Sequence, residues 1–160
     1  MIASGSILAV SCGMSNAALT AVLRLVQIEA TIQAQFTGTL SSIHGLALNE
    51  LLLLINLEAA PLGRMRRVDL AATLSISQSS VTRMAMPLEK IGLVSRDTDP
   101  RDGRVAYVVL TDVGRERTLE AKATLTHLSA SVFTEKFTST EIKSLVSLLG
   151  KLSAIRASAP

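Results

Sequence analysis

Residues 77–111 read SQSSVTRMAMPLEKIGLVSRDTDPRDGRVAYVVLT, and this stretch decides the fold. A helix is predicted to start at Ser77, a favoured N-cap residue, and to stop at Gly92, because glycine commonly follows the last helical residue. Two runs rich in apolar and β-branched residues come next, at 93–97 and 105–110, as expected of two paired strands. The turn between these runs carries Arg101 and Arg104.

The residues before this stretch also predict a helix and a turn. A short helix is expected at 68–74, and Ser75 stands where such a turn needs a left-handed residue, commonly glycine. Two helices joined by a tight turn and followed by a basic hairpin form the layout of a winged helix-turn-helix. The predicted fold is therefore mainly α with a small β-hairpin wing, a winged helix-turn-helix flanked by long N- and C-terminal dimerisation helices.

Within the helix that starts at Ser77, apolar and polar residues are expected on opposite faces. The predicted buried stripe consists of Val81, Met84 or Ala85, Leu88 and Ile91. Gln78, Ser79, Thr82, Arg83 and Met86 are expected to face outward, and most of these can reach base edges or phosphates. Pro87 conflicts with a regular helix because it lacks an N–H donor, so the helix either kinks there or ends near Met86 and restarts.

Composition indicates one domain with an aliphatic core. Apolar residues make up 48% of the 160 residues and aromatic residues only 2%. Eight of the 16 basic residues lie between 64 and 104, which marks that quarter as the basic part of the chain. Three of them, Arg64, Arg66 and Arg67, are candidate phosphate contacts on a short third strand, although a solvated loop explains them equally well.

The flanking segments are predicted to be helices that extend beyond the winged unit. Residues 16–46 repeat apolar positions at three- and four-residue steps, and 112–157 hold two helices, the second opened by a capping box of Thr138 and Glu141. We interpret both segments as dimerisation helices around a DNA-binding unit at 47–111. Residues 1–15 are expected to be a disordered leader.

These motifs together resemble the MarR family of winged-helix regulators over about residues 17–156. The most specific part is the run DPRDGR at 99–104 followed by VAYVVLT at 105–111 and Gly114, with VTR at 81–83 and LEKIGLV at 88–94. The resemblance implies a homodimer that holds two winged domains one DNA turn apart on a near-palindromic, double-stranded operator. The function implied is that of a transcriptional regulator, in the form of a repressor.

The resemblance also implies which residues meet DNA. In the wing, Arg104 would enter the minor groove and Asp102 would brace it, beside Arg101. In the major groove, six residues match the family's recognition-helix contacts: Ser77, Gln78, Ser79, Ser80, Thr82 and Arg83. Pro87 and Ser75 depart from the usual family pattern.

Family members commonly release DNA when a small anionic aromatic molecule binds. The corresponding residues here are Leu23, Gln27, Ile28, His44, Leu48 and Leu52. Ordinary core packing is the alternative role for them, and the scarcity of aromatic residues favours that alternative.

Other functions find little support in the sequence. There is no catalytic triad, phosphate-binding glycine loop or metal-ligand cluster, so we expect neither an enzyme nor a metal site nor a cofactor. Cys12 is the only cysteine and the apolar run at 51–57 is too short to span a membrane, so a cytoplasmic protein is expected. The main alternative to a DNA-binding regulator is a winged-helix module that binds another protein.

Overall fold

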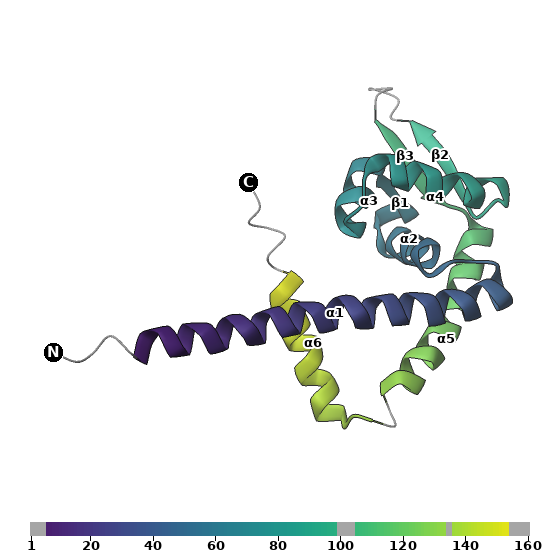
Figure 1. Ribbon diagram of the computed structural model, residues 1–160. Helices are drawn as coiled ribbons and strands as arrows, with labels where there is room; N and C mark the ends of the chain where they lie inside the picture. Colours follow the sequence, from purple (N-terminus) through teal and green to yellow (C-terminus); the bar gives the residue numbers. More distant parts are fainter. Residues whose placement is uncertain (1–5, 99–104, 134–135, 154–160) are drawn as a thin grey trace. The chain divides into compact units, whose positions relative to one another are not determined.

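A computed structural model of the chain describes residues 6–98, 105–133 and 136–153 (Figure 1). The chain divides into two compact units, Met1–Asn49 and Glu50–Pro160. The second unit contains the helix-turn-helix and a three-stranded sheet, which confirms the predicted fold class.

The first unit consists mainly of one long helix, α1 (Ser6–His44). It begins ten residues before the expected start at Asn16, so it includes much of the segment that was expected to be a disordered leader. Every residue from 16 to 31 is exposed, including Leu19, Val22 and Val26. Among residues 16–44 of α1, buried apolar residues appear only toward the end, at Phe36 and Leu40. Residues 16–31 therefore carry an apolar surface that the single chain leaves open to solvent.

Helix α2 (Leu48–Ala59) supplies the centre of the core. Four of its leucines are fully buried: Leu51, Leu53, Leu54 and Leu57. Leu52 lies on the opposite face and is 37% exposed, so this helix is less completely buried than its apolar sequence predicts.

The sheet is antiparallel, with the strand order β1-β3-β2. Strand β1 (Arg64–Arg66) follows a 3-10 turn, η1 (Pro61–Gly63), and pairs with β3 (Ala106–Leu110); β2 (Val94–Thr98) pairs with the other edge of β3. The structure thus settles the alternative that the sequence left open for residues 64–66 in favour of a strand. Val108 and Leu110 of the central strand β3 are buried.

The two helices of the helix-turn-helix are α3 (Arg67–Leu74) and α4 (Gln78–Lys90). Ser75 between them has φ 57° and ψ 39°, the left-handed conformation that the turn was predicted to need. Helix α4 is continuous through Pro87, so the two-helix alternative is wrong. Ile91 was also expected in the buried stripe, but α4 ends at Lys90 and the Ile91 side chain is 60% exposed.

Two further helices, α5 (Asp112–Phe133) and α6 (Ser139–Ser153), complete the chain. The predicted capping box of α6 is present: the Thr138 N–H donates to Glu141 Oε2 at 2.8 Å, and the Glu141 N–H donates to Thr138 Oγ1 at 3.3 Å. The hydrogen bond from the Thr138 N–H lowers the pKa of the Glu141 carboxyl, because it stabilises the charged form. Among the described residues, no single helix is both long and apolar enough to cross a membrane, although α1 from Asn16 and α2 pass that test as a bent pair.

Helix α5 begins so close to β2 that only glycine fits at its third residue. A Cβ on Gly114 would overlap the Leu93 carbonyl oxygen and lie 2.9 Å from Leu110 Cδ1. We expect Gly114→Ala to destabilise the fold by about 2 kcal/mol or more, because the backbone must shift to relieve the overlap. Thermal or urea unfolding measures the loss.

Gly150→Ala is the matched control, since nothing lies within 4 Å of a Cβ at Gly150 in α6. Alanine there should stabilise the helix by about 0.5–1 kcal/mol. Equal effects of the two substitutions would contradict the close packing of α5 on β2.

Candidate DNA-binding surface

Helix α4 begins with a cluster of hydroxyl groups. The backbone of Ser77 is extended and its Oγ accepts a hydrogen bond from the Ser80 N–H at 3.1 Å, as an N-cap residue does. The same Oγ lies 2.8 Å from Ser79 Oγ and 2.9 Å from Ser80 Oγ. Ser77 therefore holds the start of the helix and links the three serines in one network.

The polar side chains predicted to read DNA gather on the first two turns of α4. Gln78, Ser79 and Arg83 are exposed, whereas Ser80 and Thr82 are half-buried. Arg83 Nη2 donates to Ser80 Oγ at 3.2 Å. On the opposite side of the helix Val81, Ala85 and Leu88 are buried, so the helix is anchored by one face and presents the other.

Two of the three arginines proposed as phosphate contacts are paired with carboxylates. Arg66 Nε and Nη2 donate to the two carboxylate oxygens of Asp69, at 2.6 and 3.2 Å. Arg64 Nη1 donates to Asp97 Oδ2 at 3.3 Å, and its guanidinium lies over the Tyr107 ring, 4.8 Å from the centroid. The hydrogen bond and the charge of Asp69 raise the pKa of the Arg66 guanidinium.

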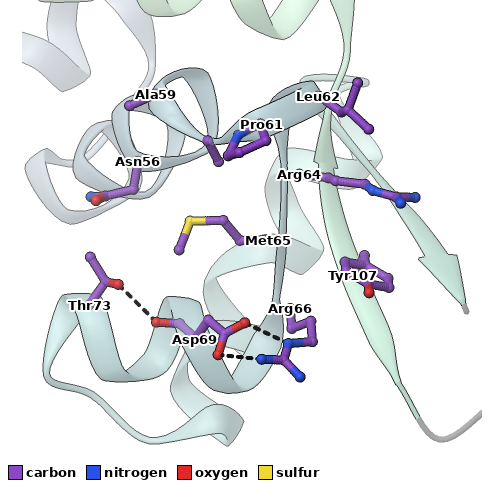
Figure 2. Close-up of a pocket in the computed structure, with 11 residues that line it drawn as sticks. Asn56, Ala59, Pro61, Leu62, Arg64, Met65, Arg66, Asp69, Thr73 and Tyr107 are labelled. Atoms are coloured by element: carbon purple, nitrogen blue, oxygen red, sulfur yellow. Dashed lines mark hydrogen bonds and ion pairs between the residues drawn. The ribbon is translucent and has the colours of Figure 1, made fainter.

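These pairs border an open hollow of about 540 Å³ beside β1. Figure 2 shows Asp69 between Arg66 and Thr73, with Met65 and Asn56 further along the wall. Sequence reasoning missed the carboxylates: Asp69 follows Arg66 by three residues, a spacing that signals a pair on a helix, but Asp97 is 33 residues from Arg64. A third pair that it missed joins Arg96 Nε of β2 to Glu89 Oε2 of α4 at 2.8 Å.

Arg67 differs from its two neighbours because its bond is to a hydroxyl. It is half-buried, and its Nη1 donates to Thr82 Oγ1 at 3.3 Å. This bond connects the start of α3 to the face of α4 that carries the predicted DNA contacts.

The remaining predicted sites are less informative. Arg101, Asp102 and Arg104 of the wing lie outside the described residues. The expected effector residues Leu23, Gln27 and Ile28 are exposed on α1. His44 ends α1 and is half-buried, Leu48 begins α2 and is buried, and Leu52 is exposed one turn later.

The family comparison matches the part of the chain in which a helix-turn-helix leads into a small antiparallel sheet. The model of the MarR family matches residues 46–106, from two residues before α2 to the start of β3. Over these residues the chain is similar to the MarR family. The match takes in α2, β1, α3, α4 and β2, and it ends at the first residue of β3.

Similar proteins agree with that assignment. An uncharacterised HTH-type transcriptional regulator of Bacillus subtilis, YdgJ, is 44% identical over 54 residues, which are 34% of this chain and 33% of that relative. The match thus spans about a third of the relative's length.

Solved structures, a MarR-family regulator among them, share the fold over most of the chain. Sco3205 of Streptomyces coelicolor, solved in complex with DNA, superposes with a TM-score of 0.77 at 24% identity, covering 84% of this chain and 85% of that one. CouR of Rhodococcus jostii, solved with bound p-coumaroyl-CoA, has a TM-score of 0.70 at 23% identity and covers 85% of this chain and 91% of its own.

The serine network at the start of α4 can be tested by removing the cap. We expect Ser77→Ala to destabilise the helix-turn-helix domain by about 1 kcal/mol, because the Ser80 N–H loses its acceptor. Ser79→Ala removes a hydroxyl from the same network but no cap, and it should change the free energy of unfolding by less than half as much. Equal losses in chemical denaturation would contradict the capping role.

Proposed function

We propose that the chain is a sequence-specific DNA-binding transcriptional regulator. The observation that carries the proposal is the first half of α4. Its N-terminus is capped, one face is buried in the core, and the other face presents polar side chains directly before the sheet. Such a helix, when it enters the major groove, can hydrogen-bond to base edges and phosphates. The solved DNA complex of Sco3205, which shares the fold, supports the same use.

The contacts proposed for DNA fall into two sets. In the major groove they are Ser77, Gln78, Ser79, Ser80, Thr82 and Arg83. In the minor groove they are Arg104, braced by Asp102, with Arg101 beside it, because a narrow A·T-rich groove concentrates negative potential that attracts a guanidinium. Arg64 and Arg66 can contribute phosphate contacts only if a phosphate replaces the carboxylate to which each of them is paired.

The proposed assembly is a homodimer formed by the N- and C-terminal helices. It is supported by large apolar side chains that the single chain exposes on α1 and α6, including Val26 at 61% and Val146 at 64%. Surfaces of this kind on a soluble protein mark sites of association. Two copies held at a fixed distance would read two half-sites about one helical turn apart.

We further propose that the regulator is a cytoplasmic repressor released by a small anionic aromatic ligand. CouR, a relative in fold, was solved with a ligand that contains an aromatic acyl group, which supports this class of effector. The residues we would test for ligand contact are Leu23, Gln27, Ile28, His44, Leu48 and Leu52.

Arg83 is the side chain whose loss should change base specificity. Selection of bound duplexes from a random pool gives the operator, and Arg83→Ala should then weaken operator binding by about 1–3 kcal/mol and relax selection at one position. Arg104→Ala should weaken binding most where A·T pairs flank the half-sites. Electrophoretic mobility shifts measure both effects.

Arg117→Ala is the control for lost positive charge, because Arg117 is exposed on α5 and paired with Glu120. It should leave base selection unchanged. A binding isotherm that hardly changes with salt, or no enriched duplex at all, would instead favour a protein-binding module.

The dimer depends on apolar contact along α6. Sedimentation should give twice the chain mass of 16.9 kDa for the wild type, and Val146→Glu should shift it toward the monomer because a buried carboxylate lacks a partner. Ser147→Glu adds the same charge at the next exposed position and should leave more of the dimer intact. A monomeric wild type at micromolar concentration would rule out the proposed assembly.

A further inference from the structure

A small hollow lies where α3, α4 and β3 begin. Its volume is about 170 Å³, which corresponds to several water molecules at about 30 Å³ each. None of the residues lining it is acidic. They are Arg66, Arg67, Val68, Gln78, Val105 and Ala106.

The guanidinium of Arg67 is the group in this hollow that still needs an acceptor. Its Nη1 bonds the hydroxyl of Thr82, which itself donates to the Gln78 carbonyl oxygen at 3.0 Å. Its Nε is buried and has no hydrogen-bond partner among the described residues. A buried donor without an acceptor is costly, so an anion that supplied one would be stabilised there.

The neighbouring arginines show why Arg67 stands apart. Arg66 reaches the hollow too, but both of its bonding nitrogens are held by Asp69, and Arg64 is held by Asp97. An anion approaching those two must compete with a carboxylate, whereas Arg67 bonds to a hydroxyl and no acidic residue lines the hollow. A guanidinium binds phosphoryl oxygens well because its donors match their geometry.

We propose that this hollow is a phosphate-binding site, with Arg67 as its main donor and Gln78 at its rim. The proposal rests on the proposed function. The hollow lies between the first residue of α4 and the strand that leads out of the wing. A domain with α4 in the major groove and the wing in the adjacent minor groove must straddle the sugar–phosphate strand that separates them. A phosphate of that strand is the anion that we assign to the hollow.

The test is to place a competing carboxylate inside the hollow without touching Arg67. Val68 lines it and is 48% exposed, so Val68→Glu can pair with Arg67 at little risk to folding. Binding to a labelled random-sequence duplex is measured between about 50 and 200 mM salt. The magnitude of the slope of log affinity against log salt concentration should fall by about 0.9 in Val68→Glu, the equivalent of one phosphate contact. Val68→Gln, of equal size but neutral, should keep the wild-type slope.

A second pair of variants separates the hollow from a general charge effect. Ala72→Glu adds the same carboxylate to an exposed position of α3 outside the hollow, and it should reduce the slope less than Val68→Glu does. Arg67→Ala should lower the slope by about 0.9, whereas Arg64→Ala should lower it less. Thermal unfolding of each variant checks that it is folded. Equal slopes for Val68→Glu and Ala72→Glu, or a wild-type slope in Arg67→Ala, would overturn the assignment.

Inorganic phosphate distinguishes the possible sources of the anion and also works if the chain binds no duplex. At constant ionic strength, exchange of chloride for phosphate should raise the Tm of the wild type but not of Val68→Glu if the hollow accepts free phosphate. A lower slope for Val68→Glu without such a Tm rise would assign the hollow to the DNA backbone alone. An equal rise in both proteins, with equal slopes on DNA, means an adventitious ion only and overturns the proposal. Failure of the wild type to bind any duplex would remove the proposed function, while the phosphate measurement would still decide the site.

Discussion

The hydroxyl of Thr111 holds together the three elements on which the candidate surface depends. It donates to the Gly92 carbonyl oxygen at 2.7 Å, lies 3.1 Å from that of Leu93, and accepts the Gly114 N–H at 2.9 Å. One side chain therefore joins the end of α4, the start of β2 and the start of α5, directly after β3. Because Gly114 admits no Cβ, this junction has little freedom, and α4 and the strands β2 and β3 keep a fixed relation.

More of the positive charge on the same unit is paired with carboxylates than the sequence suggests. A cluster of eight basic residues between 64 and 104 indicates a strong electrostatic footprint, but Arg64, Arg66 and Arg96 each hold a carboxylate partner. Such exposed pairs add little to stability, but a phosphate must compete with a carboxylate at each of them. In the proposed regulator these pairs would moderate non-specific attraction to DNA and leave a larger share of the affinity to contacts that read bases.

Sequence reasoning succeeded where a local rule has a local cause. The N-cap at Ser77, the left-handed Ser75 and the box at Thr138 and Glu141 are fixed by neighbours within three or four residues. Sequence reasoning failed where the cause lies far along the chain or depends on the residue at which a helix ends. Asp97 meets Arg64 only because β3 brings β1 and β2 into one sheet, and Ile91 leaves the buried stripe because the helix stops one residue earlier.

Arg67 combines both situations. Its sequence position beside Arg66 makes the two look interchangeable. However, α3 begins at Arg67, and the two side chains have different partners: Arg66 bonds to Asp69 of α3, and Arg67 bonds to Thr82 of α4. A helix start between adjacent arginines thus separates a neutralised cation from one that retains an unsatisfied donor. Since Thr82 belongs to the face proposed to read bases, a phosphate bound at Arg67 would also bear on how that face is presented, so backbone contact and base reading in this domain are expected to be coupled rather than additive.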